Sequence, residues 1–431
     1  MHSLHQLLLS ALATLAVGLK PGDEEITGQI PLGDPKVDGI KLPWEQQNDN
    51  TNNPFPDLEL EDEYSLPPSW QGPSHCVGEY CLFSNPTFGT DGIAMVTTPQ
   101  SAWISVNFRP VADKTVESTA YSVAPIPGKG LGIVANRLIK KGEIIMQRTP
   151  AVMIHSKPHV ELQPEVREKV YEAMINALSE TAREKFLAQY GDTVRDKIDN
   201  NAFRMFVGDD QHEHESHLGS FPEIARINHD CRPNLHYRLT NITHTTVAVR
   251  DIPAGEELTI SYIYGQASKK TRTKELQDWG FNCSCSQCTL SGFETAASDA
   301  RVREIKRLEK EIEDKMTKGG KEIKPEMAGK LVQLYLDERL HAYLAPTYTR
   351  AALIYSMFGN EEKARELATE AVGALTREYG AHAKDIPSMR QLAENPKGHW
   401  SWGIKVVSEE PKKKWKLGGK KQNATETVKG K

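Results

Sequence analysis

The stretch "RINHDCRPN" (Arg226–Asn234) carries a His, a Cys and two Asn between two apolar runs, and a proline interrupts it. An ordinary surface loop needs no such combination, whereas a loop that binds a ligand or a metal would use most of these side chains. The Cys of this stretch, Cys231, is the natural starting point, because its possible partners lie about fifty residues further along the chain.

Three cysteines follow closely in "CSCSQC", at Cys283, Cys285 and Cys288. Three thiolates within six residues can surround one tetrahedral ion, and a closed structural zinc site needs a fourth ligand, for which Cys231 is available. Disulfide pairing and plain buried thiols remain as alternatives, although cysteines this close pair poorly with one another. A zinc ion bound by all four would bring Phe281 beside the "NH" of the opening stretch.

Two further motifs lie before the first of these segments and between the two. "GKGLGIVA" (Gly128–Ala135) is glycine-rich, but no amphipathic helix follows it, which argues against a dinucleotide fingerprint. It predicts a β-hairpin whose backbone approaches a ligand, or a simple tight turn. "GEELTISYIY" (Gly255–Tyr264) predicts a strand with Tyr262 and Tyr264 on one face. Such tyrosines belong to a core, or they line a narrow channel.

The remaining pattern divides the chain into a β-rich and a helical part. Short β-branched runs with Gly and Pro turns from about residue 120 predict strands and hairpins, and apolar spacing of three and four predicts helices over about 157–206. After Cys288 the pattern is helical to about residue 392. Residues 347–380 predict a helix, a Gly-Asn turn and a second helix with closely packed alanines. They resemble a tetratricopeptide-type hairpin or belong to a generic antiparallel bundle.

The two ends and the overall composition set further limits. A hydrophobic content of 38% and a net charge of −5 are ordinary for a soluble globular protein, and no direct nucleic-acid or membrane site is predicted. The apolar run Leu7–Gly18 predicts a secretory signal peptide or a buried N-terminal helix, and it is too short to span a bilayer. The lysine-rich tail after residue 410 is a solvated, disordered end, or it steers the protein toward nucleic acid or an acidic partner. Cys76 and Cys81 form a disulfide or stay reduced.

Taken in order, "GKGLGIVANRLIKKGEII", "RINHDCRPN", "GEELTISYIY" and "FNCSCSQC" resemble the SET-domain protein methyltransferases. The most similar subgroup is the SET-and-MYND type, whose SET domain is split by an insert and is followed by a cysteine cluster and a helical region. "PKGHW" near residue 396 is similar to fungal relatives. The resemblance implies an α+β fold: a β-rich SET domain with a pseudoknot and a helical insert, a post-SET zinc site, and an all-α, tetratricopeptide-like C-terminal domain.

The resemblance also implies roles for individual residues. S-adenosyl-L-methionine would be the methyl donor, the substrate would be a protein or peptide that bears a lysine, and Zn²⁺ would be structural. The implied donor-binding residues are Lys129, Leu131, Asn228, His229 and Phe281. Tyr262 corresponds to the catalytic tyrosine and Tyr264 to a residue of the lysine channel. The implied zinc ligands are Cys231, Cys283, Cys285 and Cys288.

Two departures from the family pattern leave a second interpretation open. Asp230 stands where the family usually has Ser, and the MYND zinc cluster is missing. The resemblance predicts a lysine methyltransferase. The two departures favour the alternative, an adaptor that binds protein partners through its helical domain. The signal-like leader favours the secretory pathway, whereas the resemblance favours the nucleus or cytoplasm.

These expectations give one domain plan. It comprises a signal-like segment (1–18), a partly disordered arm (19–119), a SET domain (120–266) with a helical insert (157–220), a post-SET cluster (267–290), a helical domain (291–395) and a C-terminal segment (396–431).

Overall fold

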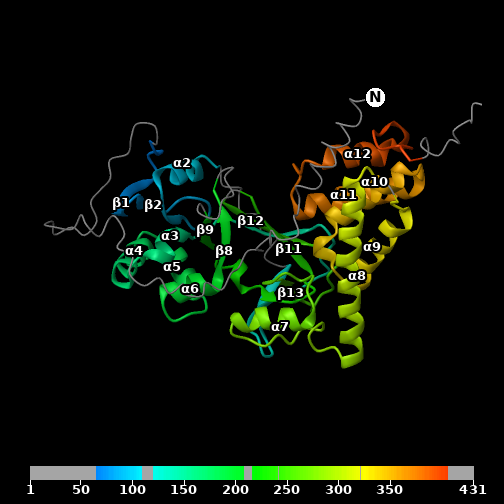
Figure 1. Ribbon diagram of the computed structural model, residues 1–431. Coiled ribbons are helices and arrows are strands. Elements are labelled where there is room, and N and C mark those ends of the chain that lie inside the picture. The colour runs from blue at the N-terminus through cyan, green and yellow to red at the C-terminus, as the bar shows by residue number, and fades with distance from the viewer. Residues whose placement is uncertain (1–64, 109–119, 208–215, 241, 321, 406–431) are drawn as a thin grey trace, which may run out of the picture.

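The computed structural model describes residues 65–108, 120–207, 216–240, 242–320 and 322–405. The signal-like segment and the lysine-rich tail lie outside these residues. Figure 1 shows the strands toward one side and the centre of the molecule, and the helices that follow residue 291 on the other side. This arrangement confirms the predicted α+β fold with a helical C-terminal region.

The largest sheet has six strands in the order β1-β2-β3-β7-β9-β8. They are β1 (Gln71–Val77), β2 (Tyr80–Asn85), β3 (Ile93–Thr97), β7 (Val152–His155), β8 (Ala202–Phe206) and β9 (Ser216–Ser220). β3 and β7 run parallel, and the other neighbours are antiparallel. Helix α2 (Pro99–Asn107) contacts β2 and β3.

The expected arm over 19–119 contains ordered elements, because β1, β2, β3 and α2 all lie within that range, while residues 19–64 and 109–119 lie outside the described residues. Every residue of β2 and of β3 is buried. Strands buried on both faces form short apolar runs without alternation, so they give no period-two signal. Cys76 in β1 and Cys81 in β2 form a disulfide, which selects one of the two states considered for this pair.

Two smaller sheets carry the motifs from which the resemblance was drawn. One has the order β10-β13-β5-β4 and the other β11-β12-β6. Their strands are β4 (Tyr121–Ile126), β5 (Gly130–Ala135), β6 (Ile144–Arg148), β10 (Asn228–His229), β11 (Leu235–Thr240), β12 (Thr243–Ala248) and β13 (Glu257–Ile260). β4 and β5 form the predicted hairpin, with Gly128 in its turn at φ +75° and Gly130 at the start of β5 at φ +78°. β10 pairs in parallel with β13, which joins the "NH" motif to the "GEELTI" motif.

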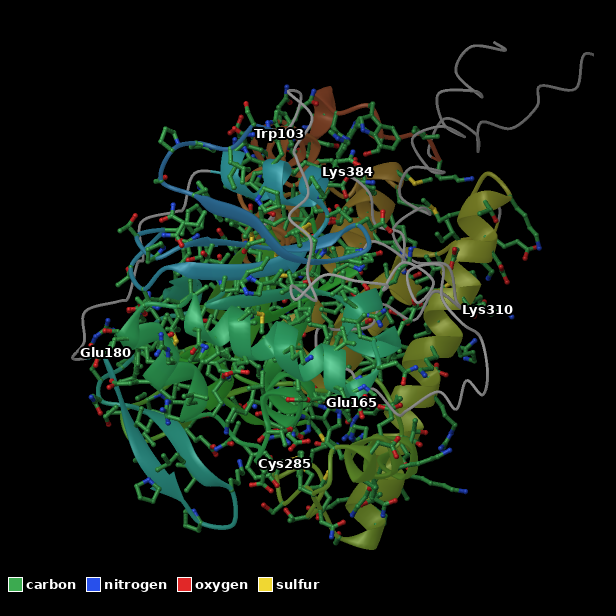
Figure 2. The ribbon with its side chains drawn as sticks, turned by 90° about the vertical axis from the view of Figure 1, so that its left-hand side faces the viewer. Trp103, Glu165, Glu180, Cys285, Lys310 and Lys384 are labelled. Carbon is green, nitrogen blue, oxygen red and sulfur yellow. A yellow bond between two sulfur atoms is a disulfide. The ribbon has the colours of Figure 1, made fainter. Side chains whose placement is uncertain are left out.

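The helical insert is shorter than predicted. Its helices are α3 (Ser156–Glu161), α4 (Pro164–Asn176), α5 (Glu180–Leu187) and α6 (Val194–Asn201), and Glu165 and Glu180 mark α4 and α5 in Figure 2. The last part of the expected 157–220 range forms β8 and β9 instead. β9, with the sequence SHLGS, is fully buried although most of its residues are small or polar, so neither propensity nor hydrophobicity predicts it.

The C-terminal region shares one core across five helices. Helix α7 (Lys269–Asp278) precedes them, and they are α8 (Gly292–Thr317), α9 (Pro325–Asp337), α10 (Ala345–Met357), α11 (Glu361–Glu378) and α12 (Ile386–Glu394). The helix–turn–helix prediction for 347–380 is confirmed, and Ala364, Ala368 and Ala371 are fully buried. The tetratricopeptide assignment stays a prediction. Among the described residues, no helix combines the length and the apolar character that a membrane crossing requires.

Strand β11 holds the helical region against the sheets. The Arg238 guanidinium donates to the carbonyl of Arg377 at 2.9 Å, and the His236 ring lies 3.3 Å from the carbonyl of Glu378. Both carbonyls belong to the last turn of α11, where carbonyl oxygens lack partners within the helix. The two side chains therefore cap a helix end and join the two parts of the chain.

Candidate active site and metal centre

The four predicted zinc ligands lie together. Cys231 lies two residues after the short strand β10, and the other three occupy the loop between α7 and α8. Their Sγ atoms all lie within 4.8 Å of one another, and the sulfurs of Cys231 and Cys288 are 3.5 Å apart. Since Zn–S bonds are about 2.3 Å long, sulfurs at the corners of a tetrahedral site lie about 3.8 Å apart. The four thiols therefore fit one structural zinc ion with no open coordination position.

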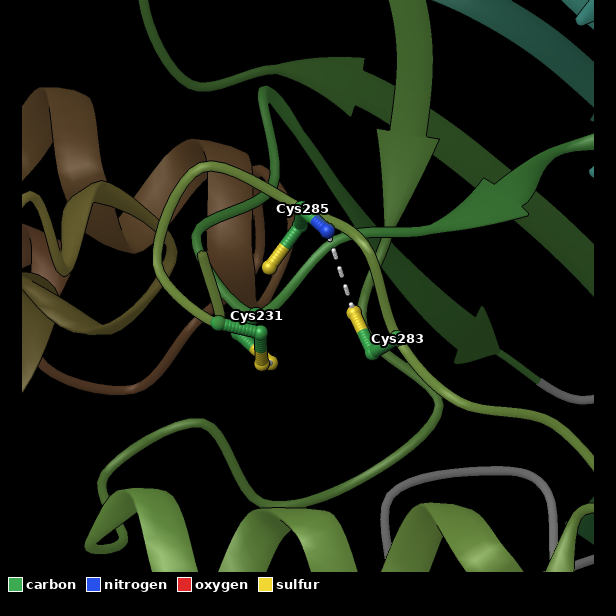
Figure 3. Close-up of side chains that lie close together, drawn as sticks. Cys231, Cys283 and Cys285 are labelled. Carbon is green, nitrogen blue, oxygen red and sulfur yellow. Dashed lines mark hydrogen bonds between the residues drawn. The ribbon is translucent and has the colours of Figure 1, made fainter. Parts of the chain in front are cut away.

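Local backbone turns aim the sulfurs at a common centre. Figure 3 shows Cys231 approaching from one stretch of chain and Cys283 and Cys285 from another. The backbone N–H of Cys285 points at the sulfur of Cys283 at 3.5 Å, and the N–H of Cys288 donates to the carbonyl of Cys285 at 3.0 Å. The first of these contacts favours the charged form of the Cys283 sulfur, and the second closes the turn between Cys285 and Cys288.

A buried cation accompanies the cysteines. The side chain of Arg272, in α7, is almost fully buried. Burial alone would lower the pKa of Arg272, but the thiolates of Cys231 and Cys288 raise it overall. A fixed positive charge beside four thiolates offsets the net negative charge that they would keep even when zinc is bound.

His229 connects the metal centre to the predicted catalytic tyrosine. Its Nδ1 accepts the backbone N–H of Tyr262 at 3.0 Å, and its Nε2 lies 3.3 Å from the sulfur of Cys231. Burial lowers the pKa of His229 to about 3, so the ring is neutral at physiological pH. Because Nδ1 accepts, the single ring proton resides on Nε2 and points at the sulfur.

Tyr262 lies among aromatic rings. Its ring centroid is 5.4 Å from that of His229, 5.2 Å from that of Trp279 and 6.3 Å from that of Phe281, which meets it edge-on. A metal ion bound by the four cysteines would fix Phe281, since Cys283 is only two residues further along. Sequence reasoning missed Trp279. Its signal was a second aromatic residue two positions before Phe281, the same spacing as between Tyr262 and Tyr264.

The hydroxyl of Tyr262 is oriented by the main chain. It donates to the carbonyl of Ile227 at 2.7 Å. Burial, together with the nearby carboxylate of Glu257, raises the pKa of Tyr262 above its usual value, so the group stays a neutral phenol. Tyr262 can therefore act as an oriented hydrogen-bonding group but not as a phenolate base.

A second polar group lies beside the β4–β5 hairpin. The amide of Asn228 donates to the carbonyl of Leu131 at 3.2 Å and to the carboxylate of Glu257 at 2.9 Å. The other oxygen of Glu257 pairs with the ammonium of Lys129 at 2.7 Å. Gly132 permits this approach, because a Cβ there would lie 2.6 Å from the Asn228 amide nitrogen. Sequence reasoning missed Glu257, the first residue of β13, whose signal was an acidic residue at the start of the predicted strand.

Leu131 and Tyr264 differ from the expectation in how they are placed. The side chain of Leu131 is 52% exposed, and its carbonyl rather than its side chain holds Asn228. Strand β13 ends at Ile260, so Tyr262 and Tyr264 do not share a strand face. The Tyr264 ring instead meets the ring of Tyr343 edge-on at 6.1 Å, and its hydroxyl donates to Gln266 at 2.7 Å.

The second Asn of the opening stretch has a structural use. Asn234 is buried, its amide donates to the carbonyl of Glu257 at 2.8 Å, and its Oδ1 accepts the N–H of Thr259 at 2.8 Å. It thus pairs with both polar groups of a strand backbone, like an additional strand residue. Asp230, the departure from the family pattern, accepts the N–H of Arg232 at 2.7 Å, a bond that a Ser hydroxyl can also form.

Residues 130–263 match the family model of the SET domain, so the chain contains a SET domain. Over 184 residues it is 32% identical to the histone-lysine N-methyltransferase set5 of Schizosaccharomyces pombe, and this match covers 40% of the chain and 52% of the relative. It is 33% identical to the N-lysine methyltransferase SMYD2-B of Danio rerio over 112 residues, which is 25% of each chain. It is 34% identical to the histone-lysine N-methyltransferase SMYD3 of Homo sapiens over 101 residues, which is 22% of this chain and 24% of the relative.

These matches confirm the resemblance to SET-domain methyltransferases and to the SET-and-MYND type. The chain spans about half the length of the first of these relatives and about a quarter of the other two.

Proposed function

We propose that the chain is a methyltransferase that transfers a methyl group from S-adenosyl-L-methionine to the side-chain amine of a protein lysine. The observation that carries the proposal is that two other motifs meet at Tyr262. His229 of the "NH" pair and Phe281, which precedes the cysteine cluster, both contact it. The SET-domain match and the names of the relatives give further support.

The residues beside the hairpin fit the donor. S-adenosyl-L-methionine, when bound, supplies an electrophilic methyl group on a sulfonium. The Lys129 ammonium would hold its carboxylate, and Asn228 and Glu257 provide acceptor oxygens for its amino group. Phe281 offers a ring face for the adenine, and the exposed side chain of Leu131 offers an apolar wall. The arrangement thus matches a ligand that has a zwitterionic end and an aromatic end.

The aromatic rings around Tyr262 would favour the neutral form of the lysine amine. The lysine amine must arrive neutral, although its free pKa is about 10.4. Desolvation between Tyr262 and Trp279 disfavours the ammonium, and the proton leaves to solvent before transfer. The phenol of Tyr262, oriented by the carbonyl of Ile227, would help to align the amine. Alignment of this kind supplies a large part of the rate enhancement in bimolecular transfers.

Two measurements on the full chain test this proposal. Isothermal titration with S-adenosyl-L-methionine should show binding near one to one, and incubation with methyl-labelled donor should label a lysine-containing protein in a lysate. Binding with no transfer to any histone, peptide or lysate protein would favour the adaptor interpretation. Absence of binding in zinc-loaded protein would contradict both the donor site and the activity.

For the helical region we propose a role in docking protein partners or substrates. The support is the succession of antiparallel helix pairs, in which α10 and α11 pack through small residues as tetratricopeptide hairpins do. Photo-crosslinking from exposed positions of α11, followed by mass spectrometry, would identify such a partner. Crosslinks that remain scattered over unrelated proteins would argue against a docking surface.

A further inference from the structure

One buried carboxylate of the helical region contacts both segments that carry zinc ligands. Glu338 follows α9, and its side chain is fully buried. Its Oε1 accepts from the Arg232 guanidinium at 2.6 Å and from the Gln287 amide at 2.9 Å. Arg232 directly follows Cys231, and Gln287 directly precedes Cys288. The Glu338 carboxylate therefore holds the chain neighbour of one predicted zinc ligand in each of the two segments.

Arg232 uses its whole guanidinium in this contact. Its Nε donates to the backbone carbonyl of Glu338 at 2.7 Å, and its Nη1 donates to the carbonyls of Cys231 at 2.6 Å and Gly265 at 2.8 Å. The side chain is 1% exposed. Three segments thus share one cation: the segment after β10, the segment after Tyr262, and the end of α9.

Further contacts hold the carboxylate in this position. Its Oε2 accepts from Arg301 of α8 at 2.8 Å, and the hydroxyl of Ser298 in the same helix donates to Oε1. Next to it, the Arg339 guanidinium donates to Gln287 at 3.1 Å. A carboxylate at the C-terminal end of a helix is unfavourable with respect to the helix dipole. Its position is explained by these partners and not by any benefit to α9.

We infer that Glu338 and Arg232 are positioning residues through which the helical region holds the metal centre and the donor site in shape. The inference rests on the proposed function only for its donor-binding part. The helical region would then be an integral part of the active site as well as a surface for partners. Removing the carboxylate charge leaves the buried Arg232 without its counter-ion. The backbone of Cys231, which Arg232 contacts, and the nearby Asn228-His229 pair are then held less firmly in position.

The test uses the full chain with zinc bound. In Glu338→Gln we expect zinc affinity, measured by competition with a chromogenic chelator, to fall about 10- to 100-fold, the range found for residues that orient metal ligands. Titration should show weaker binding of S-adenosyl-L-methionine. The matched control is Glu370→Gln, because Glu370 also joins the two regions, through Lys141 at 3.1 Å, but at the surface. Parent-like zinc affinity in Glu338→Gln would overturn the inference.

A second variant separates positioning from folding. The double substitution Arg232→Met with Glu338→Leu replaces the buried pair by apolar groups, which often preserves stability. A folded double variant that releases zinc more readily than the parent supports the inference, whereas parent-like zinc and donor affinities would show that the pair only fills space. If the parent fails to bind the donor, the proposed function fails, while the zinc competition still decides the role of Glu338.

Discussion

The ring nitrogen Nδ1 of His229 accepts the backbone N–H of Tyr262 at 3.0 Å, so the motif that would bind the methyl donor holds the residue that would act on the lysine. The opposite nitrogen of the same ring faces the Cys231 sulfur at 3.3 Å. One neutral imidazole therefore links the cysteine cluster and the candidate active site.

The first prediction concerns the Tyr262 hydroxyl. Tyr262→Phe should lower kcat by about 100-fold, because a loss of alignment of roughly 1 Å has this effect on transfer reactions. It should leave the Kd for S-adenosyl-L-methionine nearly unchanged, since the backbone N–H that bonds to His229 remains. Label transfer under donor saturation measures kcat, and titration measures Kd. Tyr190→Phe, at a position that is 80% exposed, is the control. Turnover at the parent rate in Tyr262→Phe would remove this role.

The second prediction concerns the metal. Purified protein should contain one zinc ion per chain by elemental analysis, and Cys285→Ser should lose most of it and unfold at a lower temperature. Zinc that binds the native state and not the unfolded chain stabilises the native state, so loss of the metal lowers stability. Ser284→Ala, at the exposed neighbouring position, should behave like the parent. Folded, soluble parent protein without bound zinc would contradict the interpretation of the cysteine cluster.

The third prediction concerns pH and stability. His244 is fully buried among Phe203, Phe221 and Tyr237, and within the described residues neither ring nitrogen has a hydrogen-bond partner. Burial, with smaller contributions from His236 and Arg238, lowers the pKa of His244 to about 3. Its unfolded value is about 6.5, so the unfolded chain binds a proton that the native state excludes.

This group therefore contributes stability that is present above pH 6.5 and is lost as pH falls toward 3, at up to about 1.4 kcal/mol per pH unit. His244→Phe should flatten the decline in the free energy of unfolding between pH 7 and pH 5. Urea titration at both pH values, on parent and variant with zinc bound, measures it. Equal slopes in the two proteins would show that His244 does not exclude its proton.

The fourth prediction concerns the disulfide. The double variant Cys76→Ser with Cys81→Ser should lose about 2 kcal/mol of stability, the chain-entropy value for so short a loop. Both cysteines are buried in the native state, so their state should be read by peptide mapping under non-reducing conditions. Alkylation of Cys76 and Cys81 in denatured parent protein that has never met a reductant would contradict the bond.

The sequence predicted the parts of the site whose signals are local. The spacing of Cys283, Cys285 and Cys288 with an unmatched Cys231 was sufficient to predict that the four thiols gather in one place, because ligand spacing reflects what one tetrahedral ion requires. The glycines before Gly132 predicted the hairpin for a similar reason, since a turn with positive φ favours this residue.

Signals that depend on distant partners did not emerge from the sequence. Glu338 is one acidic residue among 58 Asp and Glu, and nothing near it in the chain indicates that it meets Arg232. The strands β2 and β3 were missed because burial on both faces removes their alternation. The two tyrosines were placed on one strand face because alternation was extended past Ile260, where the strand ends and each ring meets different neighbours.

The bond between Arg232 and Glu338 spans 106 positions of the chain, and this span sets the order of events during synthesis. A polypeptide leaving the ribosome exposes Asn228, His229 and Cys231 well before α9 and Glu338 have emerged. Sheets and cysteines can gather early, but the guanidinium of Arg232 stays without its counter-ion until translation has passed the end of α9. A nascent chain that stalls before that point would therefore carry an unfinished pocket, exposed to chaperones and proteases.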